Sequence, residues 1–303
     1  MANKLEYRPT PKEYKPQEVF PGVTRPTAKQ PGRIERVDYT TSGQPKHAYV
    51  YLPHGYDPAK KYDILYLMHG GGDRADKFLG TDDTENEFKG TLDHMIENGD
   101  IRPVIVVSPS YYPMDVALGG PGSAGELVEI FHKEFVDDLV PAVEGRYSTY
   151  AASTDRAGIK ASRDHRAFGG FSMGACTTWW QFIHGLDYVA TFLPLSGDCW
   201  ALGQRAGADK PKETAEFLAK AVRDSGRTKN DFRIFAATGT KDIAFDALDP
   251  QLAEMKKLTD VFDFGETAEE GNLHYILAPD LGHQWGPIWD YCYDIMLAIY
   301  PKN

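Results

Sequence analysis

The sequence predicts an α/β fold with a mostly parallel central sheet and helices on both faces. Short apolar runs alternate with longer segments of helical periodicity along most of the chain, which is typical of such folds. Two of the runs, residues 63–68 and 104–108, lack polar alternation, as expected of strands covered on both faces. The 303 residues, 42% of them hydrophobic, suffice for one large core. We therefore expect one main domain with right-handed crossovers between parallel strands.

Residues 33–40 and 46–52 are expected to form an antiparallel hairpin at the edge of the sheet, with Ser42-Gly43-Gln44-Pro45 as its turn. Further strands are predicted at residues 63–68, 104–108, 164–171, 189–195, 232–237 and 273–277. Helices are predicted at residues 87–98, 125–143, 173–184, 213–223, 252–262 and 288–299. The helix at 125–143 has a predicted buried stripe of Leu127, Ile130, Phe131, Phe135, Leu139 and Val143.

The first 32 residues differ in composition from the rest of the chain. They contain six prolines, Pro9, Pro11, Pro16, Pro21, Pro26 and Pro31, which favour an extended chain. Residues 1–32 are therefore predicted to be either a linker to another module or an irregular arm wrapped on the domain. The domain itself is predicted to span residues 33–303.

Charge and hydropathy exclude several classes of function. The formal net charge of −11 and the pI near 5.3 argue against nucleic acid as a partner, because binding to phosphate backbones relies on clustered Lys and Arg. No apolar run approaches the roughly 20 residues of a membrane span, so no membrane partner is expected. The N-terminus also lacks the apolar core of a secretory signal. The protein is then either cytosolic or secreted with a signal outside this sequence.

The segment Gly170-Phe171-Ser172-Met173-Gly174 matches the G-x-S-x-G pattern of a nucleophile elbow. This elbow is a strained turn between a strand and a helix, and the flanking small residues allow the two backbones to pass closely. The predicted strand before Ser172 and the predicted helix after it supply that context. Ser172 is therefore the predicted nucleophile.

A second glycine-rich segment, His69-Gly70-Gly71-Gly72, follows the predicted strand at 63–68. Glycines there allow backbone amides to turn toward a ligand, as in the oxyanion loops of esterases. The Gly71 amide, with Gly72 as the alternative, is expected to act with the Met173 amide on the oxyanion of a tetrahedral intermediate. A glycine-rich turn without a catalytic role is the other interpretation.

Two further loops at strand ends supply the partners of a catalytic serine. Asp242 follows the predicted strand at 232–237 and could orient an imidazole, with Asp246 and Asp249 as rivals or as helix caps. His283 lies on a glycine-marked loop after the predicted last strand and is the expected general base, with His69 as its competitor. The order Ser, Asp, His along the chain is that of α/β-hydrolases.

Together the motifs HGGG, GFSMG, SGDCW, GTKD and GHQW, in this order over most of residues 33–300, resemble the feruloyl esterases of carbohydrate esterase family 1. The similarity is greatest to the esterase modules of clostridial modular xylanases. It implies an α/β-hydrolase fold and hydrolysis of feruloyl esters of arabinoxylan by Ser172, Asp242 and His283. The resemblance also implies that no metal or organic cofactor is needed, and that Trp200 of the SGDCW motif flanks the phenolic ring. Ordinary packing is the other interpretation of Trp200.

The same resemblance implies a secreted enzyme that acts on feruloylated plant cell-wall polysaccharide beside xylanase or binding modules. Related activities stay open, since acetylxylan esterases and S-formylglutathione hydrolases share the elbow and the triad. A non-catalytic carbohydrate-binding protein on a hydrolase scaffold is an alternative of another class, which the intact Ser, Asp and His disfavour.

Three cysteines exclude a full disulfide framework, and Cys176 and Cys199 are expected to be reduced and buried, although they could approach each other. Of the clustered aromatics, Tyr111 and Tyr112 could line the cleft, while Trp179 and Trp180 are expected in the core.

Overall fold

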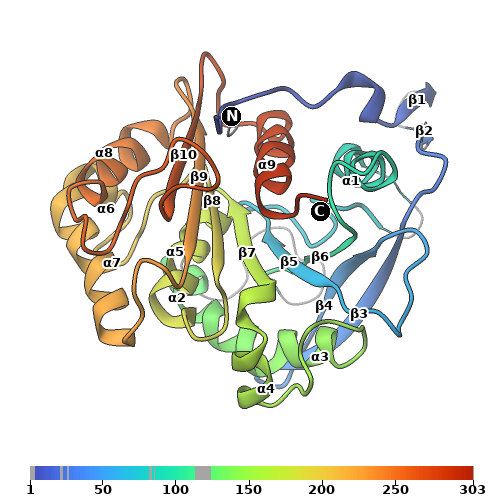
Figure 1. Ribbon diagram of the computed structural model, residues 1–303, viewed down its shortest axis with the longest axis horizontal. Coiled ribbons are helices and arrows are strands. Elements are labelled where there is room, and N and C mark those ends of the chain that lie inside the picture. Colours follow the sequence, from blue (N-terminus) through green and yellow to red (C-terminus); the bar gives the residue numbers. More distant parts are fainter. Residues whose placement is uncertain are drawn as a thin grey trace.

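An eight-stranded mixed sheet runs through the centre of the protein (Figure 1). The computed structural model describes residues 4–20, 23–25, 27–81, 84, 86–112 and 124–302. The strand order is β10-β9-β8-β7-β5-β6-β4-β3. β4 is antiparallel to both of its neighbours, β3 and β6, and the other neighbouring strands are parallel to each other. The strands are β3 (Arg33–Thr41), β4 (Gln44–Leu52), β5 (Asp63–Met68), β6 (Val104–Ser108), β7 (Arg166–Phe171), β8 (Thr191–Leu195), β9 (Arg233–Gly239) and β10 (Leu273–Ala278). This is the predicted α/β-hydrolase architecture with its antiparallel N-terminal edge.

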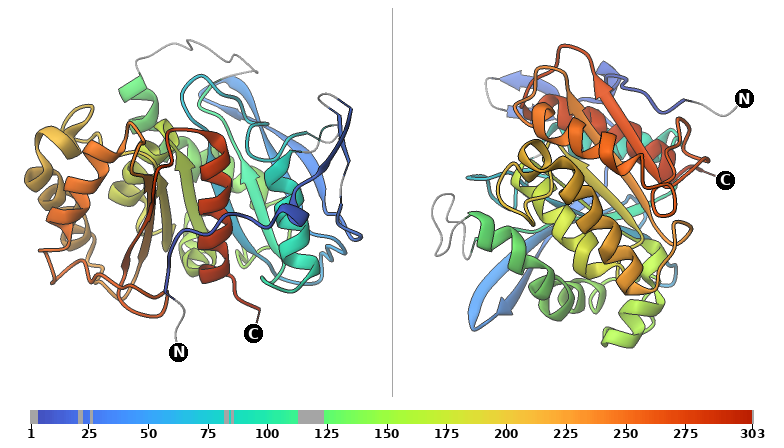
Figure 2. Two further views of the ribbon diagram at one scale, coloured as in Figure 1. Left: turned by 90° about the horizontal axis from the view of Figure 1, so that it is seen from above. Right: turned by 90° about the vertical axis from the view of Figure 1, so that its left-hand side faces the viewer.

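Helices cover both faces of the sheet (Figures 1 and 2). The α-helices are α1 (Glu87–Glu97), α2 (Ala124–Glu134), α3 (Val140–Glu144), α4 (Arg156–Ala161), α5 (Met173–Gly185), α6 (Ala206–Asp209), α7 (Pro211–Ser225), α8 (Phe245–Met255) and α9 (Trp285–Ile299). Two short 3₁₀ turns, η1 (Lys12–Tyr14) and η3 (Arg163–His165), a π-helical turn η2 (Phe135–Leu139) and a small separate hairpin of β1 (Gln17–Phe20) and β2 (Val23–Arg25) complete the elements. None of the helices in the described ranges is long and apolar enough to cross a membrane.

Alternation along β5 divides the core into two layers. Ile64, Tyr66 and Met68 pack into the layer that contains α2, α5 and α7, whereas Leu65 and Leu67 pack into the layer that contains α1 and α9. Because successive side chains of a strand point to opposite faces, an apolar run without alternation is what a doubly covered strand requires. The carboxyl ends of β5, β7, β8, β9 and β10 consequently meet at one edge, where their loops converge.

Three predictions for individual elements are wrong in part. The edge hairpin turns over only Ser42 and Gly43, both with positive φ, so its strands are longer than expected. The helix predicted at 125–143 contains the π-helical turn η2, and Ile130 of its stripe is 53% exposed. The helix predicted at 252–262 instead begins at Phe245 and ends at Met255.

The N-terminal segment lies along α9 before it reaches α1, as the left view of Figure 2 shows. The Tyr7 hydroxyl and the Thr10 amide donate to the carboxylate of Asp290 at 2.8 and 2.9 Å, and the Arg8 amide donates to Asp294 at 2.7 Å. Both carboxylates are buried. Residues 4–14 therefore supply hydrogen bonds that these two acids would otherwise lack.

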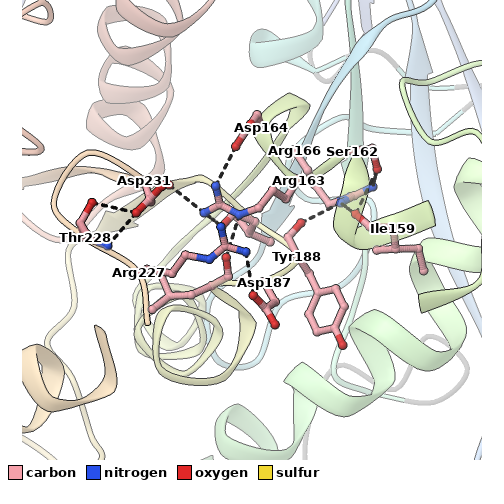
Figure 3. A network of polar contacts seen from close by, with 12 residues as sticks. Ile159, Ser162, Arg163, Asp164, Arg166, Asp187, Tyr188, Arg227, Thr228 and Asp231 are labelled. Carbon is pink, nitrogen blue, oxygen red and sulfur yellow. Dashed lines mark hydrogen bonds and ion pairs between the residues drawn. The ribbon is translucent and has the colours of Figure 1, made fainter. Parts of the chain in front are cut away.

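Two arginines tie the loops together at the end of the sheet opposite Ser172, in the network shown in Figure 3. Arg166 Nη1 donates to the carbonyl oxygens of Ile159 and Tyr188 at 2.9 and 2.7 Å. Arg163 Nη2 donates to the Asp231 carbonyl at 2.8 Å. The segments that lead into β7, β8 and β9 are thereby joined.

Arg166 also forms a buried ion pair with Glu144, in which its Nε and Nη2 donate to the two carboxylate oxygens at 2.6 and 2.8 Å. We expect Glu144→Ala to lower the free energy of unfolding by about 3–5 kcal/mol, because it leaves the guanidinium buried without its counter-charge. Unfolding in urea measures this loss. Glu216→Ala, which breaks an exposed pair with Arg223, is the control, with an expected loss below about 1 kcal/mol. Equal losses in the two variants would contradict the assignment.

Candidate active site

The predicted elbow lies between β7 and α5, with Ser172 at φ 57° and ψ −115°. Its two glycines are required by close backbone contacts. A Cβ on Gly170 would lie 2.5 Å from the carbonyl oxygen of Met68, and one on Gly174 would lie 2.2 Å from the same atom. The turn is fixed further by a 3.0 Å hydrogen bond from the Ser172 amide to the Leu195 carbonyl. The strained backbone thus holds the Ser172 side chain at the carboxyl edge of the sheet.

The structure brings Ser172, His283 and Asp242 together from three separate loops. His283 Nε2 lies 2.9 Å from Ser172 Oγ, and His283 Nδ1 lies 2.7 Å from Asp242 Oδ1. The Asp242 side chain is fully buried, whereas the His283 side chain is 20% exposed. A buried carboxylate at Nδ1 favours the tautomer in which Nε2 can accept the serine proton. The rival Asp246 lies in the first turn of α8 and is exposed.

The Asp242 and His283 loops are held in contact by their backbones. The Lys241 amide donates to the Leu281 carbonyl at 3.0 Å, and the Asp280 amide donates to Thr240 Oγ1 at 2.8 Å. A Cβ on Gly239 would lie 2.1 Å from the Leu281 oxygen, so only glycine permits this approach. The hydrogen bond between Asp242 and His283 therefore rests on a rigid backbone.

The glycine loop after β5 lies against the start of α5. A Cβ on Gly71 would lie 3.0 Å from Met173 Sδ, so these two residues are neighbours. The Gly72 amide already donates to the Tyr112 hydroxyl at 3.2 Å. Met173 is the first residue of α5, so its amide is among those without a partner inside the helix. This arrangement favours Gly71 over Gly72 as the second oxyanion donor.

His69, the competitor for the role of base, is buried, and both of its ring nitrogens face partners other than Ser172. Its Nδ1 lies 2.7 Å from the Gly70 carbonyl and its Nε2 lies 2.9 Å from Ser110 Oγ. Burial lowers the pKa of His69 to about 4, so the ring stays neutral. His69 therefore supports the glycine loop rather than the chemistry at Ser172.

A cavity of about 170 Å³ opens beside Ser172 and His283. We call it the Trp200 cavity; its other lining residues are Cys176, Ser196, Gly197, Asp198, Trp200, Arg205, Ile243, Ala244 and Ala247. They come from α5, from the loops that follow β8 and β9, and from the start of α8. A mostly apolar cavity with an indole on its wall suits a planar aromatic acyl group.

Asp198 fixes the Trp200 side chain in this cavity. Its Oδ1 accepts a hydrogen bond from Trp200 Nε1 at 3.1 Å, and its Oδ2 accepts one from the Gly207 amide at 2.9 Å. Burial is the main influence on Asp198 and raises the pKa of its carboxyl. Because one oxygen accepts from the indole and the other from the Gly207 amide, Asp198 fixes the orientation of the Trp200 ring.

Sequence reasoning did not name Arg205, Ile243, Ala244 or Ala247 of the Trp200 cavity, and it gave Cys176 and Asp198 no role there. Two of them carried a usable signal, since Cys176 lies one helical turn after Ser172 and Ile243 directly follows Asp242. Arg205 carried none, because its left-handed backbone at φ 59° depends on tertiary packing.

The other residues singled out by the sequence are buried. Cys176 and Cys199 are free and buried, as expected of reduced thiols. Tyr111 and Tyr112 are also buried, with the Tyr111 hydroxyl 2.7 Å from Thr177 Oγ1, so they pack beneath the glycine loop. Trp179 and Trp180 lie in the core. Across the described ranges, no three His, Cys, Asp or Glu residues are grouped as a metal site would require.

On this α/β-hydrolase fold, the elbow serine contacts a histidine, and the histidine contacts a buried aspartate. This is the arrangement of serine hydrolases. Comparison with known families agrees with this class. Residues 40–257 match the family described as "Putative esterase". The chain belongs to this esterase family and is a carboxylic ester hydrolase.

Individual relatives make the comparison more specific. The chain is 41% identical over 292 residues to endo-1,4-beta-xylanase Y of Acetivibrio thermocellus; these residues are 96% of this chain but 24% of that protein. Among solved structures, a serine-to-alanine mutant of the feruloyl esterase module from Clostridium thermocellum, complexed with sinapinate, is 40% identical, with a TM-score of 0.83 over 99% of this chain and 95% of that one. A ferulic acid esterase from Anaeromyces mucronatus shares the fold at 18% identity, with a TM-score of 0.64 over 95% and 94% of the two chains. The chain thus spans about a quarter of the curated xylanase that it matches.

Proposed function

We propose that this esterase hydrolyses feruloyl and related hydroxycinnamoyl esters of arabinoxylan through an acyl-enzyme on Ser172. The observation that carries the proposal is the Trp200 cavity, which places an indole and an apolar wall beside the Ser172 hydroxyl. A relative of 40% identity was solved with sinapinate, a hydroxycinnamate, and this supports the same acyl class here.

The first half of the reaction transfers the acyl group to the enzyme. His283 Nε2 takes the proton of Ser172 Oγ while Asp242 stabilises the resulting imidazolium. The serine oxygen attacks the ester carbonyl, and the amides of Gly71 and Met173 receive the charge that develops on the carbonyl oxygen. When the tetrahedral intermediate collapses, His283 gives its proton to the sugar oxygen, and the alcohol leaves.

The second half returns the enzyme to its starting state. His283 takes a proton from water, the hydroxide attacks the acyl-enzyme, and the same two amides stabilise the second intermediate. Ser172 leaves with the proton from His283, and the free acid is released. The cycle uses these side chains, the two amides and water.

We further propose that the protein is secreted and acts beside other modules on plant cell walls. The support is that relatives of this chain are parts of larger polypeptides named as xylanases, one of them an endo-1,4-beta-xylanase/feruloyl esterase of Xylanibacter ruminicola that is 30% identical over 177 residues. A linker to such modules would then lie outside residues 4–14, which bond to α9.

The proposal predicts that Trp200→Ala harms large acyl groups selectively. Burial of a hydroxycinnamoyl ring against an indole face is worth about 1–3 kcal/mol, which corresponds to a roughly 5- to 150-fold fall in kcat/KM for methyl ferulate. An acetyl group is too short to reach the indole, so kcat/KM for an aryl acetate should stay nearly unchanged. Steady-state kinetics on both esters measure the difference.

Trp200→Phe is the matched control, because it keeps an aromatic face and should retain most of the activity on methyl ferulate. A folding defect would reveal itself by lowering both rates. Equal loss on the two esters, or a preference of the unmodified protein for acetyl over feruloyl esters, would favour an acetylxylan esterase instead.

A further inference from the structure

A second cavity lies next to the loop that follows β5. It has a volume of about 450 Å³, and its lining includes Gly72, Asp73, Arg74, Asp76, Lys77 and Trp289. We call it the β5-loop cavity; its size is within the roughly 300–1,000 Å³ of small-molecule sites. In the sheet, β7 lies between β5 and β8. The β5-loop cavity and the Trp200 cavity, which is bounded by the loop after β8, therefore lie on opposite sides of Ser172.

The loop that bounds the β5-loop cavity also approaches the catalytic serine. A Cβ placed on Gly70 would lie 3.3 Å from Asp73 Oδ2 and 3.5 Å from Ser172 Cβ, so the Asp73 carboxylate and the serine are close together. Gly72, in the same wall, directly follows the proposed oxyanion donor Gly71. A ligand in the cavity would therefore be separated from an ester at Ser172 only by the short loop from Gly70 to Asp73.

A row of aromatic rings connects His283 with the far wall of the same cavity. The Phe171 ring lies 4.6 Å from the His283 ring and 4.9 Å from the Trp285 ring, measured between centroids. The Trp285 and Trp289 rings, one helical turn apart on α9, are 6.2 Å apart. The histidine that must protonate the leaving alcohol thus stands at one end of this row, and the β5-loop cavity at the other.

The polar groups of the cavity suit a neutral ligand that has many hydroxyl groups. Asp73 and Asp76 offer acceptors, and Arg74 and Lys77 offer donors. The charges are paired, since Arg74 lies 3.4 Å from Asp76 and Lys77 lies 3.9 Å from Asp73. Trp289 adds an indole to the lining, which can pack against the apolar face of a sugar ring. Balanced charge beside an aromatic wall selects a carbohydrate over an ionic ligand.

From this arrangement we propose that the β5-loop cavity binds the pentose units of the arabinoxylan that forms the alcohol side of the ester. The inference rests on the proposed function, which assigns the acyl group to the Trp200 cavity. An ester carbonyl carries its acyl and alkoxy groups on opposite sides, so an acyl group in the Trp200 cavity directs the sugar toward the loop after β5. Trp289 and Asp76 are then specificity residues for the sugar and touch no reacting atom.

Two substrates with the same acyl group separate sugar binding from chemistry. We expect Trp289→Ala and Asp76→Ala each to lower kcat/KM about five- to tenfold for a feruloylated arabinoxylo-oligosaccharide and to leave methyl ferulate nearly unchanged. Phe217→Ala, which removes a half-buried aromatic from a distant hollow on α7, is the matched control and should change neither rate. Losses that are equal on the two esters, or absent in both variants, would overturn the proposal.

A binding experiment tests the cavity without turnover. Calorimetric titration of the Ser172→Ala protein with an arabinoxylo-oligosaccharide that carries no ferulate should give binding that Trp289→Ala weakens. Absence of binding, or binding that Trp289→Ala leaves unaltered, would overturn the assignment of the cavity. If the unmodified protein instead hydrolyses neither feruloyl ester while this binding persists, the proposed acyl specificity fails and the sugar site stands.

Discussion

Replacement of Ser172 by alanine is expected to lower kcat by about 10⁴- to 10⁶-fold on every ester, the largest loss of any single change in this protein. The reason is that the hydroxyl 2.9 Å from His283 Nε2 is the only group placed to form the acyl-enzyme within the described site. The Trp200 cavity stays intact, so ferulate should still bind. Single-turnover kinetics and calorimetric titration with ferulate measure the two effects separately.

Residual turnover decides this test. If Ser172→Ala keeps as much as a tenth of the original kcat, Ser172 is not the nucleophile. If ferulate binding disappears together with turnover, the substitution has disturbed the cavity and not only the chemistry. A far-ultraviolet circular dichroism spectrum equal to that of the unmodified protein excludes unfolding as the cause.

Asp242→Asn is expected to have the second largest effect, a fall in kcat of about 10⁴-fold with little change in stability. Asp242 Oδ1 accepts from the Ala244 amide at 2.8 Å as well as facing His283 Nδ1. An asparagine whose NH₂ group turned toward the ring would favour the tautomer that presents Nε2–H to Ser172, which cannot accept the serine proton. Steady-state kinetics on methyl ferulate measure the loss.

Asp246→Asn is the matched control for this prediction. Asp246 lies on the same connection, at the exposed first turn of α8, and its replacement should leave kcat near that of the unmodified protein. A large loss in Asp246→Asn with full activity in Asp242→Asn would transfer the role of the acid to Asp246.

Central strands were predictable because they have to be apolar on both faces. The runs at 63–68 and 104–108 match β5 and β6 in full. The bounds predicted for the helix at 252–262 were wrong because Leu258 and Phe262 pack into the same core from turns after α8. The spacing of these apolar residues reflects their burial and not a continuous helix. The π-helical turn η2 lies inside a helical segment of apolar periodicity, and the periodicity gave no sign of it.

The candidate site was predictable to the extent that its chemistry is local. Ser172, Asp242 and His283 each stand on a loop at the end of a predicted strand, and parallel strands bring such loops to one edge. The walls of the two cavities depend on contacts distant in sequence. Trp289 meets the loop after β5 only through the packing of α9, and Ile243 lines the same cavity as Trp200 only because β9 lies beside β8 in the sheet.

The measurement that tests the central claim most directly is mass spectrometry of the protein quenched in acid during turnover of methyl ferulate. The account predicts a covalent adduct with the mass of one feruloyl group on the peptide that contains Ser172, and no adduct in Ser172→Ala. A feruloyl adduct on another residue, or one that persists in Ser172→Ala, would contradict the acyl-enzyme at the elbow.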